Sequence, residues 1–172
     1  MIFETVSPFL SSNTRHTDFS SQLPISNTSV MPFYTDSKTI RSIMKEVFDR
    51  LNDTPGASDD FVKNHMVVSL YLDNPKTFIG LDGRQKPVGL SFSPDGVKPD
   101  LAIRLDADLL HNILLGTVRL RDAYFNGSIK TKGSIFKAMK LADLFRQAEK
   151  LYPVVLKEQG LLPEDYQTGP LN

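Results

Sequence analysis

The 172-residue chain contains no cysteine and only three histidines. Without cysteine the protein has no disulfide, no thiolate nucleophile and no cysteine-ligated zinc or iron–sulfur site. His16, His65 and His111 are far apart in the sequence, so a metal site built on histidine is not expected either. The sequence also lacks the glycine-rich phosphate loop and the nucleophile elbow found in many enzymes. We therefore expect no metal and no cofactor.

Neither positive nor negative charge predominates, because 20 Lys and Arg residues are balanced by 20 Asp and Glu residues. Proteins that bind nucleic acid by neutralising phosphates usually carry a basic excess, so we expect no nucleic acid partner. Long hydrophobic runs are also missing: no segment reaches the roughly 18–20 apolar residues that a transmembrane helix needs. The first residues lack the basic leader and continuous apolar core of a signal peptide. Together these features predict a cytoplasmic location.

The composition is that of an ordinary globular domain, with 40% hydrophobic and 23% charged residues. Residues 1–36 differ from the rest because they are rich in Ser and Thr, contain three prolines and show no helical or strand period. Their scattered apolar residues predict an irregular arm rather than a plain linker. Its role as a lid, a dimer clasp or a disordered leader stays open. We expect one domain over residues 37–158 and a tail over 159–172.

Helical spacing begins at about residue 37 and predicts a helix that ends at the Asp-Thr-Pro-Gly run, residues 53–56. Asp36 or Ser37 can cap its N-terminus. Its apolar stripe follows the i, i+3, i+4, i+7 rule and consists of Ile40, Ile43, Met44, Val47, Phe48 and Leu51. From residue 67 onward the spacing changes to period two and predicts four strands, at 67–72, 77–81, 88–92 and 101–105. The short links between them favour an antiparallel meander.

The second half of the domain returns to helical spacing. Asp106 is expected to cap a short helix that stops at Gly116, and a further turn or two of helix falls within residues 118–125. A strand over residues 128–132 and a long helix opening at Ser134 complete the pattern. Pro153 is expected to end or kink that last helix.

Several motifs follow one another in a set order between Lys98 and Leu141. They are Pro99-Asp100 leading a strand, the capped helix Asp106–Gly116, Phe125-Asn126-Gly127, the Lys-rich strand Ile129–Gly133, and the helical Ala138-Met139-Lys140-Leu141. This order resembles the signature half of the sterol carrier protein type 2 lipid-binding domain. Residues 37–97 match the same family in element order.

The resemblance implies an α/β (α+β) fold, with a curved, mostly antiparallel five-stranded sheet covered by helices and enclosing an apolar tunnel. It also implies a protein that binds and transfers a fatty acyl chain, acyl-CoA, a sterol or a similar lipid, with no catalytic residues of its own. A lipid or other hydrophobic small molecule is thus the expected partner.

Candidates for the tunnel lining come from helix and strand faces with more apolar surface than ordinary packing requires. Taken singly, each is better explained by simple core packing, although the flexible thioether of Met139 suits a pocket for varied ligands. The candidates are Phe92, Leu101, Ile103, Leu110, Ile113, Leu114, Phe125, Ile129, Ile135, Met139, Leu144 and Phe145.

Residues 117–150 are basic, with eight Lys and Arg against three Asp and Glu. This excess predicts either transient docking to an anionic membrane surface or head group, or simply the solvated faces of a strand and a helix. The docking candidates are Lys130, Lys132, Lys137 and Lys140.

Two other functions stay open at this level. Asp106, Asp108 and His111 lie within helical reach of one another, so a carboxylate-oriented histidine general base is conceivable, although capping explains the same residues. With the arm as a lid, a cofactor-independent enzyme would use the same cavity, and Tyr124 would join Asp106 and His111 as a residue to test. The remaining hypothesis is an interaction module that forms a homodimer through the arm.

Overall fold

The structure is a computed structural model that describes residues 31–94, 96 and 98–163. The chain divides into two units, residues 1–31 and residues 32–172, and the description below concerns the second unit. The predicted arm (1–36) and tail (159–172) therefore lie largely outside the described residues, as residues 1–30 and 164–172.

Five strands form one sheet in the order β3-β2-β1-β4-β5. Their bounds are β1 Val67–Asp73, β2 Thr77–Asp82, β3 Gly89–Ser91, β4 Leu101–Asp106 and β5 Lys130–Gly133. The β1–β2, β2–β3 and β4–β5 pairs are antiparallel, whereas β1 and β4 are parallel. The prediction of a mostly antiparallel five-stranded sheet is confirmed.

The expected meander holds for β1 to β3 and is wrong for β4. Instead of pairing with β3, β4 pairs in parallel with β1, with Leu70 opposite Ile103. This pairing places two strands with apolar inner faces side by side at the centre of the sheet, where the burial of both is greatest. Nine residues separate β3 from β4, so the link is longer than the two-residue turn that would join the two strands as a hairpin.

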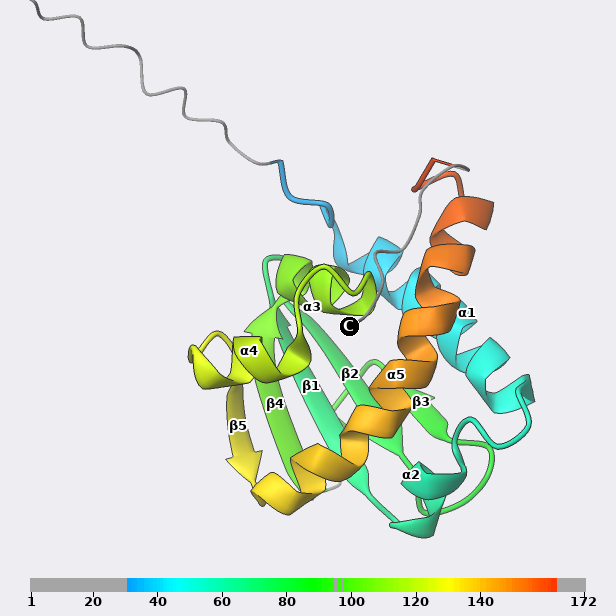
Figure 1. The fold of residues 1–172 in the computed structure, drawn as a ribbon, viewed down its shortest axis with the longest axis vertical. Coiled ribbons are helices and arrows are strands. Elements are labelled where there is room, and N and C mark those ends of the chain that lie inside the picture. The colour runs from blue at the N-terminus through cyan, green and yellow to red at the C-terminus, as the bar shows by residue number, and fades with distance from the viewer. Residues whose placement is uncertain (1–30, 95, 97, 164–172) are drawn as a thin grey trace, which may run out of the picture. The chain divides into compact units, whose positions relative to one another are not determined.

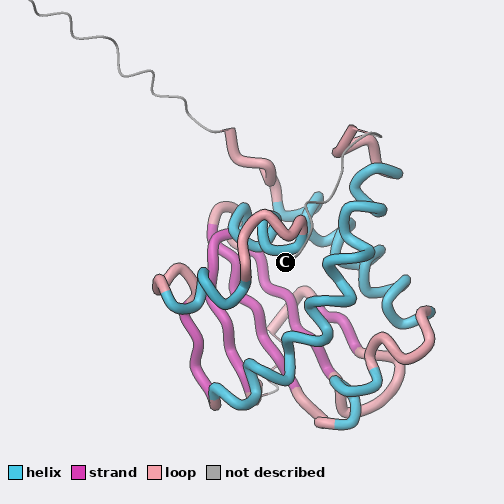
Figure 2. The backbone as a smooth tube through the Cα atoms, in the orientation of Figure 1, coloured by secondary structure: helices cyan, strands magenta, loops and turns pink. Residues whose placement is uncertain are grey.

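Among the described residues, five helices accompany the sheet: α1 Ser37–Asp53, α2 Asp59–Lys63, α3 Ala107–Leu114, α4 Leu120–Phe125 and α5 Ile135–Glu158. Figure 1 shows α5 running diagonally in front of the sheet with α1 beside its C-terminal part, and Figure 2 shows the same helical layer over the strands. The helix α2 was not predicted. The helix α5 does not end at Pro153 but continues to Glu158.

Capping at two helix starts follows the predictions. The Asp36 carboxylate accepts a hydrogen bond from the backbone N–H of Thr39 at 2.9 Å, which satisfies one of the free donors at the start of α1. The Asp106 carboxylate accepts from the backbone N–H of Asp108 at 2.9 Å at the start of α3. These caps determine where the helices begin, and Asp106 thereby turns the chain from β4 directly into α3.

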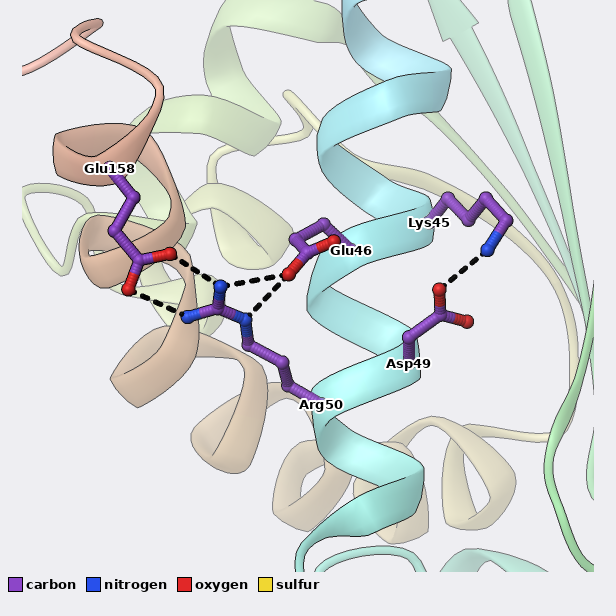
Figure 3. A network of polar contacts seen from close by, with 5 residues as sticks. All are labelled: Lys45, Glu46, Asp49, Arg50 and Glu158. Carbon is purple, nitrogen blue, oxygen red and sulfur yellow. Dashed lines mark hydrogen bonds and ion pairs between the residues drawn. The ribbon is translucent and has the colours of Figure 1, made fainter.

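The inner face of the sheet and the helices above it form a continuous core. All six predicted stripe residues of α1 are buried. Figure 3 shows an additional polar link between α1 and α5, in which Arg50 donates to Glu46 on its own helix and to Glu158 on α5. Neighbouring Lys45 and Asp49 form an i, i+4 ion pair at 2.5 Å. Exposed pairs of this kind add little stability, so apolar packing holds the two helices together.

Candidate functional site

A cavity of about 470 Å³ lies between α4, the N-terminal part of α5 and the strands β4 and β5. Its volume falls in the range of roughly 300–1,000 Å³ that is typical of small-molecule sites. The lining is Ile103, Leu105, Leu120, Arg121, Tyr124, Phe125, Ile129, Thr131, Ala138, Met139, Leu141, Ala142, Phe145, Arg146 and Glu149.

Small side chains on α5 explain why this space is not filled. Ile103 on β4 and Thr131 on β5 are opposite each other in the sheet register and form part of the floor. Above them, Ala138 and Ala142 are four residues apart and therefore lie on one face of α5. Two methyl groups do not reach the strands as larger side chains would, so the sheet and the helix leave a gap.

Two large apolar side chains of the cavity lining are exposed to solvent. Phe125 at the end of α4 is 78% exposed, and Met139 on α5 is 68% exposed. Large apolar side chains with this exposure beside a cavity are suited to contact with an apolar ligand.

Apart from Thr131 on β5, the polar side chains that line the cavity come from α4 and α5. Arg121 lies 3.6 Å from Asp122, and Arg146 lies 3.0 Å from Asp143. Burial raises the pKa of the Glu149 carboxyl, and the positive charge of Arg146 partly opposes the shift. Two guanidinium groups, one carboxyl and the Tyr124 hydroxyl can hold the polar end of a ligand whose remainder is apolar.

The structure brings five of the twelve predicted lining residues together in this cavity: Ile103, Phe125, Ile129, Met139 and Phe145. Four predicted residues, Leu110, Leu114, Leu144 and again Phe145, line a second, wholly apolar void of about 20 Å³. A void of this size has room for about one water molecule but offers it no hydrogen-bond partner.

The other predicted lining residues lie outside both spaces. Leu101 and Ile113 are fully buried in the core. Phe92 is half-buried, with the Arg41 guanidinium 5.9 Å from its ring centroid. The side chain of Ile135 is outside the part of the chain that the structure describes.

Sequence reasoning did not predict ten of the fifteen residues that line the cavity: Leu105, Leu120, Arg121, Tyr124, Thr131, Ala138, Leu141, Ala142, Arg146 and Glu149. Ala138 and Ala142 are small, and their spacing on one helix face was the available signal that α5 stands away from the sheet. The polar residues Arg121, Arg146 and Glu149 carry no such signal, because solvent-exposed helix faces contain the same residue types.

The four predicted docking lysines separate into two pairs. Lys130 and Lys132 flank Thr131 on β5 and therefore point to the opposite face of the sheet from the cavity. Lys137 and Lys140 are bonded within the chain: the Lys137 ammonium donates to Asp100 at 2.5 Å, and that of Lys140 donates to the Asn64 side chain at 2.5 Å. The Lys137 hydrogen bond lowers the pKa of Asp100, helped by the backbone N–H of Val67.

The buried histidine of α3 belongs to a polar network outside the cavity. His111 Nδ1 is hydrogen-bonded to the Tyr152 hydroxyl at 2.7 Å, and that hydroxyl is also hydrogen-bonded to the hydroxyl of Tyr34. The ring of Phe33 stacks on His111 at 3.7 Å. Burial lowers the pKa of His111 to about 4, although the negative charge of Asp108 opposes this, so the ring is neutral near pH 7.

Asp108 does not orient His111. Its two carboxylate oxygens accept hydrogen bonds from the backbone N–H groups of Phe33 and Tyr34, at 3.2 and 3.1 Å. Asp106 caps α3 and accepts a further hydrogen bond from Asn74 at 2.9 Å. Of the residues named for an enzymatic reaction, Tyr124 alone lines the cavity.

The described residues contain no group of three or more His, Cys, Asp or Glu that could hold a metal ion. Their helices include none with both the length and the hydropathy needed to cross a membrane.

Solved structures of sterol carrier proteins are similar to the chain. The sterol carrier protein domain 2 of Helicoverpa armigera is 21% identical with a TM-score of 0.54, and the match covers 67% of this chain and 91% of that domain. The apo form of sterol carrier protein 2 from Yarrowia lipolytica is 19% identical with a TM-score of 0.54, covering 69% and 98%. At these identities the likeness shows the fold alone.

At the level of sequence, no curated protein matches the chain. The family described as the SCP-2 sterol transfer family matches residues 44–146. That range is more than half of the chain, and it contains all five strands and every cavity-lining residue except Glu149. The chain therefore belongs to the SCP-2 sterol transfer family.

Proposed function

We propose that this protein binds a fatty acyl chain, an acyl-CoA, a sterol or a similar lipid in the α4–α5 cavity and transfers it without catalysing a reaction. The observation that carries the proposal is the cavity itself, a space of about 470 Å³ with a mainly apolar lining and polar side chains from α4 and α5. An amphiphile would place its tail over Ile103 and its head near Arg121 and Arg146.

Apolar burial alone can supply the free energy of such binding, so no reactive group is needed. Burial of one methylene contributes roughly 0.8 kcal/mol, so a chain of about a dozen methylenes gains on the order of 10 kcal/mol before ordering costs are subtracted. Apolar contacts of this kind discriminate weakly between ligands of similar size. The proposal therefore names a class of ligand rather than one molecule.

Transfer without catalysis is supported by the positions of three of the four candidate catalytic residues, since Tyr124 alone among them lines the cavity. Asp106 is engaged as the cap of α3, and Asp108 is engaged by two backbone N–H groups. His111 is held by Tyr152 and does not line the cavity. A cytoplasmic location and a homodimer formed through the arm stay predictions.

Ligand binding by a variant with a larger side chain in the cavity tests the proposal. Ala142→Trp places an indole where the cavity-facing methyl group lies, and we expect it to weaken binding of a fluorescent fatty acid at least about tenfold. Val154→Trp is the matched control, because Val154 is on the same helix, is 44% exposed and lies outside the cavity. It should bind the probe as the wild type does.

Mass spectrometry of a solvent extract of the purified wild-type protein gives a second readout, and we expect it to contain a lipid that the Ala142→Trp extract lacks. The proposal fails if the wild-type protein neither carries a lipid nor takes up the probe. It also fails if Ala142→Trp binds the probe unchanged.

A further inference from the structure

The face of α5 that lines the cavity carries one carboxyl group among apolar side chains. Four lining residues follow the i, i+4, i+7, i+11 spacing that keeps side chains on one face of a helix: Ala138, Ala142, Phe145 and Glu149. The first three are apolar, as the inward face of an amphipathic helix usually is. The packing of this face therefore does not require the acid at Glu149.

The carboxyl group of Glu149 has no partner of its own. Among the described residues it makes no hydrogen bond and no ion pair. Arg146 is one turn earlier on α5, but its guanidinium lies 3.0 Å from the Asp143 carboxylate instead. Burial raises the pKa of the Glu149 carboxyl because the charge of Arg146 compensates it only in part. A half-buried carboxylate without a partner is costly, and a hydrogen-bond donor on a ligand would satisfy it.

The two cations that line the cavity are already engaged. Arg121 lies 3.6 Å from Asp122, and Arg146 lies 3.0 Å from Asp143. With Glu149, the charged lining residues and their ion-pair partners amount to two guanidinium groups and three carboxyl groups. A carboxylate head group would have to compete with the two aspartates for the guanidinium groups and would be repelled by Glu149.

We propose that Glu149 sets the head-group selectivity of the cavity, by accepting a hydrogen bond from a head group that donates one, a protonated amine before a hydroxyl, and by disfavouring the carboxylate of a free fatty acid. The inference rests on the proposed function, because it requires an amphiphile in the α4–α5 cavity. It adds the kind of head group that this amphiphile carries.

The preference arises at the head group and not along the chain. Burial of the chain depends on its apolar area, so ligands with equal chains gain the same from it. The hydroxyls of Tyr124 and Thr131 also line the cavity, but a hydroxyl both donates and accepts and therefore does not select between charges. A protonated amine makes a charge-assisted hydrogen bond to Glu149, an alcohol makes a neutral donor's bond, and a carboxylate is repelled.

Three lipids with the same dodecyl chain and different head groups test the inference. Dodecylamine, 1-dodecanol and dodecanoate compete with a fluorescent fatty acid for the wild-type protein, and each inhibition constant is corrected for the affinity of the probe. The assay is run at pH 8, where the amine is protonated and the carboxyl groups are ionised. We expect dodecylamine to bind most tightly and dodecanoate least tightly, with at least about a tenfold difference between them.

Glu149→Gln keeps the size of the side chain and removes its negative charge. We expect it to weaken dodecylamine and to tighten dodecanoate, each at least about threefold, and to change 1-dodecanol less than either. A purely structural role of Glu149 would change all three constants alike. Glu149→Asp keeps the carboxyl group and should keep the wild-type order of the three lipids. It also serves as the second variant, should thermal unfolding show that Glu149→Gln is not folded.

Glu158→Gln is the matched control, because it makes the same chemical change on the same helix at a residue outside the cavity. Glu158 pairs with Arg50 on α1, and exposed pairs of this kind add little stability. The control variant should bind the three lipids as the wild type does. It removes the same charge from the protein as Glu149→Gln, so it separates a local contact from an effect of net charge.

The inference is overturned if dodecanoate binds the wild type as tightly as dodecylamine does. It is also overturned if the order of the lipids is the same in Glu149→Gln, is lost in a folded Glu149→Asp, or changes equally in Glu158→Gln. Failure of the proposed function looks different, because then neither the fluorescent fatty acid nor any of the three lipids binds, and both ideas are wrong. If all three lipids bind equally, the proposed function stands and the selectivity of Glu149 does not.

Discussion

The two ends of α5 meet the rest of the protein in opposite ways. Near the C-terminal end, Tyr152, Val155 and Leu156 are 0% exposed, and the helix packs beside α1. Near the N-terminal end, Ala138 and Ala142 face a cavity of about 470 Å³. The void next to the packed region, by contrast, measures about 20 Å³. Side-chain size along a single helix thus separates the part that stabilises the fold from the part that leaves room for a ligand.

The largest expected difference between the two ends is in stability. Leu156→Ala removes a fully buried side chain from the packed end and should lower the free energy of unfolding by about 4 kcal/mol, as large-to-small changes in tight cores do. Met139→Ala shortens an exposed side chain at the open end and should change it by less than about 0.5 kcal/mol. Urea unfolding of both variants measures the difference. Equal losses would mean that the open end contributes to stability as the packed end does.

Titratable groups at the two ends should respond to acid in opposite directions. The pKa of His111 is about 4 in the folded protein, below its ordinary value of about 6.5, because the ring is buried. The unfolded chain therefore binds more protons between these values, and the contribution of His111 to stability is lost as the pH falls through them. We expect a loss of about 2–3 kcal/mol between pH 7 and pH 4. Unfolding of His111→Gln across this range should lack that loss.

Glu149 supplies the contrast at the open end. Burial raises the pKa of its carboxyl, so the folded protein holds the proton more tightly and acid favours the folded state at this site. Glu149→Gln should therefore make the acid destabilisation steeper, whereas His111→Gln makes it shallower. The free energy of unfolding of each variant is measured against pH. If both substitutions change its pH dependence in the same direction, burial does not shift the pKa values of His111 and Glu149 in opposite directions.

Much of the fold follows from local patterns. The apolar stripe from Ile40 to Leu51 and the cap at Asp106 predict α1 and α3, because both depend on residues a few positions apart. The parallel pairing of β4 with β1 depends on which distant strands bury most surface together, which spacing along the chain does not reveal. The helix α2 has only five residues and one buried side chain, Phe61, too few for a period to show.

The cavity was predictable in part for the same reason. Periodicity identifies the inward face of each element, and Ile103 on β4 and Phe145 on α5 are on such faces. It does not identify where a helix stands away from the sheet, because that distance depends on what every other helix packs against. Inward residues such as Leu101 therefore look identical in sequence to those that line the space, yet they lie in the core.

Phe145 joins the two regions and provides the smallest and most specific test. It lines both the large cavity and the small void, so its ring forms part of the wall between them. Phe145→Leu should lower the free energy of unfolding by about 1 kcal/mol and extend the cavity towards Met44 and Leu70. In competition assays with saturated fatty acids of increasing length, the preferred chain should become longer.

Phe48→Leu is the matched control for this wall, because Phe48 lines only the small void and is 6% exposed, close to the 8% of Phe145. Phe48→Leu should lower the free energy of unfolding by a similar amount. It should leave the chain length of the preferred fatty acid unchanged. A shift in both variants would mean that the small void already belongs to the ligand site. If the preferred chain length shifts in neither variant, the packed region does not make room for a longer ligand. The packing of α1, rather than the ring of Phe145, then limits the length of the cavity.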